Sequence, residues 1–258
     1  MLHTNRVARK PLLAMGLAVL GLTVSGLANS ALMYDQDVTP DVFYGTGNSN
    51  GGWTVDLQNN IELGLRTHRR TPAPSSETGS NGDGTYSWES GLIDGKSSWN
   101  YDFSININQD GTGSTLFDDV VVLLLIDTDP SAGVTYIALD ALAFWTDNTY
   151  GTNLSGPNST DNASASAAVN ADRGVSSGYY IAQNSQNFAW TGLDATIAGT
   201  WDFRLVVSNL NGEFLADTSM QVLVDGGAAQ VPVPGTMALF GLGLLGLGYG
   251  RRGAQALK

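Results

Sequence analysis

Alternation of apolar and polar residues, with the two-residue period of a β-strand, is the sequence feature that most constrains the fold of this chain. From Trp99 to Ile107, apolar residues occupy every second position, and Asn, Asp and Ser fill the positions between them. Residues 53–57 and 61–65 alternate in the same way. Successive side chains of a strand point to opposite faces of its sheet, so each stretch predicts a strand with one apolar and one wet face.

The rest of the central region completes an all-β pattern. The apolar run from Val120 to Ile126 has the length of a strand and predicts a central strand covered on both faces. Three more strands are expected at 178–182, 200–207 and 220–224. Turn signals such as Asn211-Gly212 separate these runs. We therefore predict a single antiparallel β-sandwich, jelly-roll-like, at residues 31–230, with polar surface loops at 71–85 and 147–177.

The N-terminus has the three parts of a secretory signal peptide at residues 1–30. A basic start with Arg6, Arg9 and Lys10 precedes an apolar stretch at 12–27, and Ala28-Asn29-Ser30 forms a small-x-small cleavage site from Ala28 to Ser30. Its expected partners are the Sec translocon and signal peptidase. The alternative is an uncleaved N-terminal anchor, which the glycines of the apolar stretch disfavour.

The C-terminal segment, residues 231–258, has a similar three-part order. A turn at Val231, Pro232, Val233, Pro234 and Gly235 precedes an apolar run, and Arg251 and Arg252 follow it. At about 1.5 Å per residue the run crosses only part of a hydrocarbon layer of about 30 Å, so we expect a short transmembrane helix at about 235–250. The two arginines should stay on the cytoplasmic side, which places the preceding residues outside the inner membrane.

This tail resembles the PEP-CTERM sorting signal of Gram-negative bacteria, in which a Pro-Glu-Pro motif, an apolar helix and a basic cluster are read by an exosortase. Val233 stands where the family has its Glu. The resemblance implies an exosortase-type processing enzyme as a partner, transient membrane anchoring, and delivery to the cell surface, the extracellular matrix or a biofilm. The alternative is a permanent weak anchor without processing.

The central region is also similar to a group of uncharacterised ectodomains with PEP-CTERM tails. The residues that carry the similarity include WTVDLQNN from Trp53, IDTDPS from Ile126 and GTWDFRLVVS from Gly199. The similarity implies a shared fold and a shared export route. It implies no activity.

Charge and composition exclude several classes of function. All 24 acidic residues lie between Asp35 and Asp225, and with only six basic residues there, the span carries a net charge of −18. Such a field repels nucleic acid, so we expect no nucleic-acid partner. The chain has no cysteine, and His68 is the single histidine after the signal peptide, which excludes thiol catalysis and a His-rich metal site within one chain. We expect His68 at the surface, in a small basic island with its arginine neighbours.

Two groups of oxygen-bearing side chains are candidate calcium ligands, although no organic cofactor is expected. Alternating Asn and Asp residues before Gly111 begin like a calcium loop, and further carboxylates follow them in sequence. The candidate ligands are Asn106, Asn108, Asp110, Asp118, Asp119, Asp127 and Asp129. The twelfth position of the loop holds Phe117 in place of a bidentate Glu. The alternative is ordinary turn chemistry, in which the same side chains hold hairpin corners.

Signals for catalysis are weak. The G-x-S-x-G strings at 47–51 and 174–178 do not lie between a strand and a helix, the context that gives that motif its reactive serine, and we expect no enzyme. The favoured function is an exported non-catalytic protein of the cell surface or extracellular matrix. The alternative is a carbohydrate-binding β-sandwich that takes exopolysaccharide and is stabilised by calcium. For that function Trp88 and Trp145 should be exposed.

Overall fold

Seven strands form the larger of two sheets in the computed structural model. The structure describes residues 31–44, 48–70, 76–131, 133–145, 147–156, 163–164 and 178–227. In spatial order the strands are β1 (Met33–Gln36), β2 (Trp53–Gln58), β3 (Ile61–Arg69), β7 (Trp99–Asn106), β12 (Ile181–Asn187), β10 (Thr149–Gly151) and β11 (Ala163–Ser164). Every neighbouring pair in this sheet is antiparallel.

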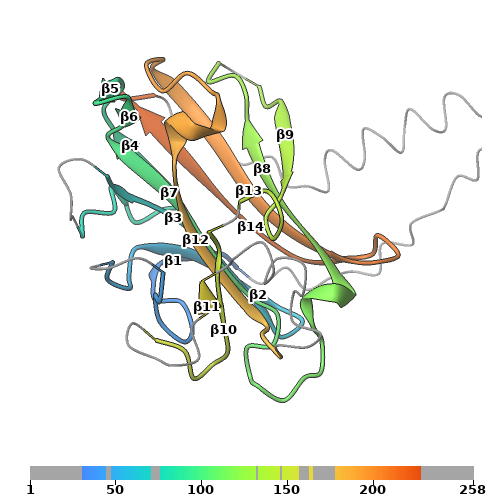
Figure 1. Cartoon of the computed structure of the whole chain (residues 1–258). Coiled ribbons are helices and arrows are strands. Elements are labelled where there is room, and N and C mark those ends of the chain that lie inside the picture. The colour runs from blue at the N-terminus through green and yellow to red at the C-terminus, as the bar shows by residue number, and fades with distance from the viewer. Residues whose placement is uncertain are drawn as a thin grey trace, which may run out of the picture.

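Five strands form the second sheet, which packs face to face against the first (Figure 1). Their order is β4 (Thr85–Trp88), β14 (Phe214–Val224), β13 (Gly199–Asn209), β8 (Val120–Asp127) and β9 (Tyr136–Asp140). The all-β sandwich is therefore confirmed. The β4–β14 pair is parallel, however, so the antiparallel arrangement does not extend to every pair.

Short elements close the ends of the sandwich. These are the hairpin of β5 (Leu92–Ile93) and β6 (Lys96–Ser97), and the 3-10 turns η1 (Phe117–Asp119) and η2 (Phe188–Thr191). Asn187 caps η2 by accepting a hydrogen bond from the backbone of Ala189.

Aromatic side chains from both sheets fill the space between them. Trp99 of β7 stacks on Phe188 of η2 with ring centroids 4.6 Å apart, and Tyr101 contacts Phe203 of β13 at 5.3 Å. These four side chains are at most 1% exposed. Because such rings each bury a large apolar area, this aromatic layer is a major source of the sandwich's stability.

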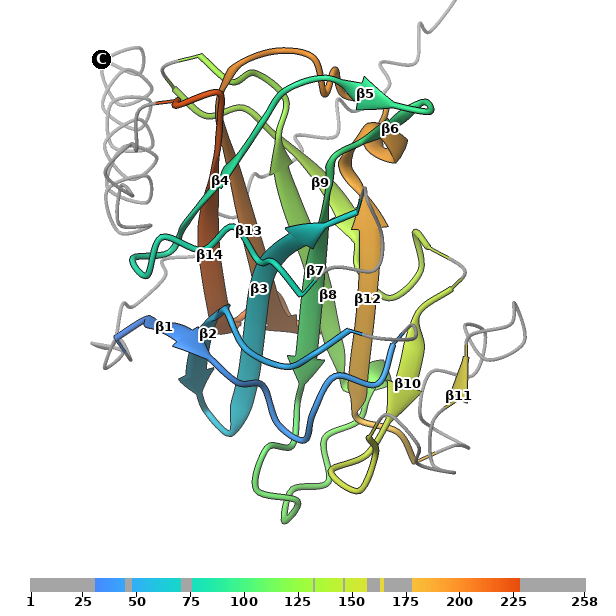
Figure 2. The ribbon, with the colours of Figure 1, turned by 90° about the vertical axis from the view of Figure 1, so that its left-hand side faces the viewer.

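A segment that follows β1 covers the outer face of the larger sheet. We call residues 37–44 and 48–52 the strap; Figure 2 shows this part of the chain passing across β3 and β7. As a result, every residue of β7 is buried, and so are all residues of β3 except Arg69. The expectation of one wet face is wrong for both strands, because their polar side chains lie beneath the strap.

The outer face of the second sheet is more exposed than the sequence predicts. Val122, Leu124 and Ile126 of β8 are buried in the core, as an apolar strand requires. Val121 is 38% exposed, and the other outward-facing residues of the run are only half-buried. The prediction that this strand is covered on both faces is therefore wrong.

Candidate functional site

A cluster of charged and polar side chains lies on the outer face of the larger sheet, beneath the strap. The β3–β7 register places Arg66 directly opposite Asp102, and His68 is two residues further along the same face. Their neighbours Leu65 and Phe103 face the core instead. Alternation along two adjacent strands therefore brings the three ionisable groups together.

Asp102 is the centre of this cluster and is fully buried. Tyr44 of the strap donates its hydroxyl hydrogen to Oδ2 at 2.6 Å, and Arg66 Nε donates to the same oxygen at 2.8 Å. His68 Nδ1 lies 2.9 Å from both carboxylate oxygens. The carboxylate is thus held by three side chains, from the strap and from β3.

The environment keeps Asp102 ionised. Burial by itself would raise the pKa of Asp102, but attraction to His68 and Arg66, with their hydrogen bonds, lowers it well below its ordinary value. Burial likewise raises the pKa of the Tyr44 hydroxyl, which therefore remains a hydrogen-bond donor. The pKa of Arg66 is raised because Tyr44 and Asp102 outweigh the effect of burial.

Arg66 connects this carboxylate to the backbone of the strap. Nη1 donates to the carbonyl oxygens of Ser49 and Gly51, each at 2.8 Å, and Nη2 donates to the Tyr44 hydroxyl at 2.9 Å. The guanidinium carbon lies 4.3 Å from the centre of the Trp53 ring, a cation–π distance. The planar fork of an arginine suits this arrangement, because its donors point in fixed and different directions.

Other polar side chains of the sheet hold the first half of the strap. Gln183 accepts from the Phe43 amide at 3.1 Å and donates to the Asp41 carbonyl at 3.0 Å. Glu62 accepts from the Thr39 amide at 2.6 Å. Burial raises the pKa of Glu62, and this hydrogen bond partly offsets the rise. The strap is thus attached to the sheet by hydrogen bonds from side chains of β3, β7 and β12, and not by the backbone hydrogen bonds of a strand pair.

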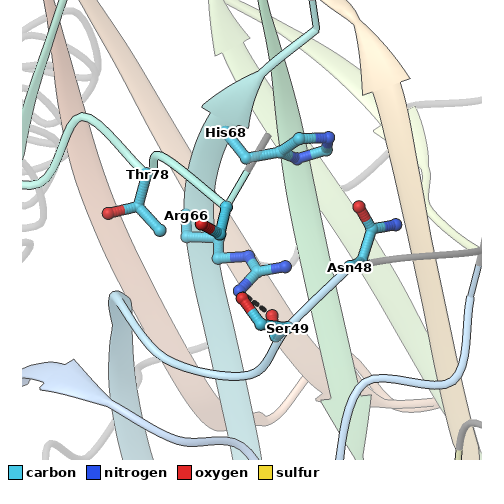
Figure 3. A pocket seen from close by; sticks show the side chains of 6 residues that line it. Asn48, Ser49, Arg66, His68 and Thr78 are labelled. Carbon is cyan, nitrogen blue, oxygen red and sulfur yellow. Dashed lines mark hydrogen bonds between the residues drawn. The ribbon is translucent and has the colours of Figure 1, made fainter. Parts of the chain in front are cut away.

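A shallow hollow opens beside Arg66 and His68 (Figure 3). It has no room for an enclosed water molecule, and Asn48, Ser49, Ser76 and Thr78 complete its lining. The His68–Asp102 pair has the form of a base and its orienting acid. Ser49, however, offers its backbone carbonyl to Arg66, whose guanidinium lies between Ser49 and His68 in Figure 3. These hydrogen bonds join the strap to the sheet.

The expectation of His68 at the surface is wrong. The side chain is 7% exposed and contacts Asp102. Nothing in the local run of basic residues indicates burial, because the cover comes from the strap, about 20 residues earlier in the chain. The long-range signal is the polar half of the β7 alternation, which places an acid opposite Arg66.

The first group of candidate calcium ligands makes turn hydrogen bonds. Asn106 accepts from the Asn108 amide at 3.1 Å, and Asn108 in turn accepts from Gly113 at 2.7 Å. Asp110 accepts from the amide and the hydroxyl of Thr112, both at 2.8 Å. These hydrogen bonds lower the pKa of Asp110. This is the turn chemistry that the sequence offered as the alternative.

The second group is dispersed. Asp118 is exposed, and Asp119 accepts from the Leu116 amide at 3.0 Å. Asp127 is buried. Asp129 is exposed, and its carboxylate accepts a hydrogen bond from the Ser131 amide at 2.9 Å. Within the part of the chain that the structure describes, no three His, Asp or Glu side chains gather as metal ligands. The structure thus does not bring the predicted calcium residues together as one site.

The two tryptophans that carbohydrate binding would expose are both buried. Trp88 is 4% exposed and donates its indole N–H to Thr67 at 2.7 Å, and Trp145 is 9% exposed and packs against Phe103. Their prediction as exposed glycan contacts is wrong, because β4 and the loop after β9 turn these rings inward. Among the described residues, Trp190 of η2, at 51%, is the exposed tryptophan.

The sorting motif (Val231 to Gly235, with Arg251 and Arg252) and the cleavage site (Ala28 to Ser30) lie outside the described residues. No helix within the described ranges has the length and apolarity that a membrane span requires, and the helix predicted at 235–250 also lies beyond those ranges.

Comparison with known families identifies the C-terminus. Residues 230–252 match the family model described as the PEP-CTERM protein-sorting motif. The chain is therefore an exported protein with an exosortase sorting signal and a transient C-terminal membrane anchor. These follow the all-β sandwich in the sequence. No curated protein and no solved structure matches the chain.

Proposed function

We propose that this chain is a non-catalytic protein of the cell surface or extracellular matrix of a Gram-negative bacterium. The observation that carries the proposal is how the buried cluster uses its hydrogen bonds. Asp102 accepts from Tyr44, Arg66 and His68, while Nη1 of Arg66 binds the strap's backbone and Nη2 binds the Tyr44 hydroxyl. Groups that could do acid–base chemistry are thus used to hold the fold closed.

The proposed route uses both termini. The Sec translocon would export the chain and signal peptidase would cleave near Ser30. The apolar run would then anchor the chain until an exosortase-type enzyme cleaves near Pro232. The matched sorting motif supports the last step, and the cytoplasmic arginines would hold the tail in place during it.

Charge reversal in the tail tests this route. Arg251→Glu with Arg252→Glu should reduce the surface and matrix fractions and leave unprocessed chain in the cell, because the basic cluster no longer fixes the orientation. Lys258→Glu, which lies beyond that cluster, is the matched control and should be delivered normally. Equal distribution of wild type and double variant between cell fractions would refute the proposed route.

Carbohydrate binding is the second candidate, and the exposed indole of Trp190 favours it. The test is retention of the exported protein on exopolysaccharide from the same host. Trp190→Ala should abolish retention, whereas Leu210→Ala, which removes a side chain that is 67% exposed, should not. Absence of retention by the wild type would exclude this function.

A further inference from the structure

Two carboxylates lie on adjacent strands at the outer face of the five-stranded sheet. The last pair of the β8–β13 register is Ile126 opposite Phe203, and Asp127 and Asp202 are the residues that directly follow this pair, one on each strand. Ile126 and Phe203 point into the core, and the two aspartates therefore point to the outer face. Paired residues of a ladder, such as Ile126 and Phe203, have Cα atoms only about 4.5–5.5 Å apart, so the residues next to them lie on neighbouring positions of the sheet.

Polar side chains extend this pair into a row across the sheet. Tyr136 of β9 is opposite Asp127, and Gln221 of β14 is opposite Asp202. Despite their place on the outer face, Asp127 is 0% exposed and Asp202 is 9% exposed. The loop between β8 and β9 contributes to this cover, since the Pro130 carbonyl accepts from the Thr200 amide at 3.2 Å.

Each of the two carboxylates has one oxygen with a partner and one without. Asp127 Oδ1 accepts from the Thr135 amide at 2.9 Å, and Asp202 Oδ1 accepts from Gln221 Nε2 at 2.9 Å. The Oδ2 atoms of both residues are buried and have no hydrogen-bond donor among the described residues. A buried carboxylate oxygen without a partner is costly, and here two belong to residues on adjacent strands.

The positive side chain that follows this pair along β13 already has a partner. Arg204 lies two residues after Asp202 on the same face, but its Nε donates to Asp217 at 2.8 Å. Tyr136 is neutral, since burial and the nearby aspartates raise its pKa to about 12. Burial, and secondarily the charge of Asp127, raise the pKa of Asp202. Like charges on adjacent strands destabilise a sheet, so the pair needs either a counter-charge or a shared proton.

We propose that the Oδ2 atoms of Asp127 and Asp202 bind one divalent cation, and that this cation is Ca²⁺. Two carboxylates neutralise its charge, and hard oxygen ligands without nitrogen or sulfur suit Ca²⁺ rather than transition metals. The site differs from the calcium loop expected from sequence. It joins Asp127 to a residue of β13, while Asp129 holds a turn.

Thermal unfolding of the full-length chain in mild detergent tests the site. After treatment with EDTA and its removal, CaCl₂ at a hundredfold excess over Kd should raise Tm by about 5 °C or more above NaCl of equal ionic strength. MgCl₂ at the same concentration should give a smaller rise, because Mg²⁺ gives up its water reluctantly. Equilibrium dialysis should find one Ca²⁺ per chain.

The variant Asp202→Asn distinguishes binding at this site from binding of Ca²⁺ to carboxylates elsewhere on the acidic surface. Its amide oxygen can still accept from Gln221, but the calcium shift and the bound Ca²⁺ should disappear. In EDTA its Tm should equal or exceed that of the wild type, because the like-charge repulsion is gone. The matched control, Asp110→Asn with Asp118→Asn and Asp119→Asn, should keep the full shift.

Three results would overturn the proposal. The first is equal melting of the wild type in CaCl₂ and in matched NaCl. The second is a calcium shift that persists in Asp202→Asn and in Asp127→Asn. The third is a wild type whose Tm does not change with Ca²⁺ but rises as pH falls, while the Tm of Asp202→Asn does not rise. The pair would then share a proton and would not bind a cation.

Discussion

Asp102→Asn should destabilise the sandwich strongly while changing its shape very little. The substitution keeps the size of the side chain but removes the charge that faces Arg66, whose side chain is 2% exposed. It also replaces an acceptor oxygen by an amide NH₂, which cannot accept from Tyr44, Arg66 or His68. The strap is held by the same donors, so it should loosen in the same variant.

The size of the expected loss in the free energy of unfolding follows from the burial of the Arg66–Asp102 pair. Removing one partner of a buried ion pair leaves the other charge without compensation, at about 3–5 kcal/mol in the free energy of unfolding. The three donors on Asp102 are consistent with this size, since a hydrogen bond to a charged group contributes about 1.5–3 kcal/mol. For a domain of this size the expected fall in Tm is about 6–20 °C.

Urea unfolding followed by tryptophan fluorescence measures the loss. The matched control is Asp217→Asn, which removes the partner of the partly exposed Arg204 at the same Nε–carboxylate distance of 2.8 Å. A pair of that kind contributes about 0–1 kcal/mol. If Asp102→Asn cost no more than this control, the buried cluster would not hold the strap and the reasoning would be refuted.

Three further predictions concern particular side chains. Trp88→Ala should cost about 3–5 kcal/mol in urea unfolding because the ring is 4% exposed, whereas Trp190→Ala, at a ring 51% exposed, should stay within about 0.5 kcal/mol; the reverse order would contradict the assigned burial. The lowered pKa of Asp102 adds stability that is fully present above the ordinary carboxyl pKa of about 3.9 and is lost as pH falls through the folded value; unfolding free energies measured against pH should therefore decline in acid for wild type and decline less for Asp102→Asn. Gly64→Ala would place a Cβ 2.7 Å from Val38 of the strap, so limited proteolysis should cut the strap faster in this variant, and an unchanged rate would show that the strap adapts.

The sandwich could be predicted because alternation is a local property. The stretch at 99–107 alternates between apolar and polar residues without interruption, which is typical of a strand with one face toward a core. The strand β7 occupies 99–106. The parallel β4–β14 pair could not be predicted in this way. Two segments more than 120 residues apart form it, and no local pattern specifies which neighbour a strand selects.

Exposure was the property that local patterns predicted least well. The polar face of β7 looks wet in sequence, yet Asp102 is fully buried beneath the strap. Conversely, the outer face of β8 looks covered, yet Val121 is 38% exposed. Both errors have one cause: the alternation within a strand specifies two faces, but whether a third layer covers a face depends on segments elsewhere in the chain.

The candidate sites show the same limit. The sequence shows that the Asn and Asp residues before Gly111 are rich in oxygen ligands, but it does not distinguish a calcium loop from the turn geometry that the structure has there. The sequence does not indicate the Asp127–Asp202 pair, because 75 residues separate its members and only the pairing of β8 with β13, which ends at the preceding residues, brings their strands together. The sorting motif was found from sequence alone because it is a linear signal, and the family match confirms it.

Intact-mass analysis of the protein recovered from fractions of its native host tests the central claim most directly. We expect a mature form in the surface or matrix fraction that begins near Ala31, ends near Pro232 and lacks the apolar run with its two arginines. Recovery of the chain with its C-terminal tail intact, as a stable species of the inner membrane, would contradict exosortase-type processing and delivery to the surface.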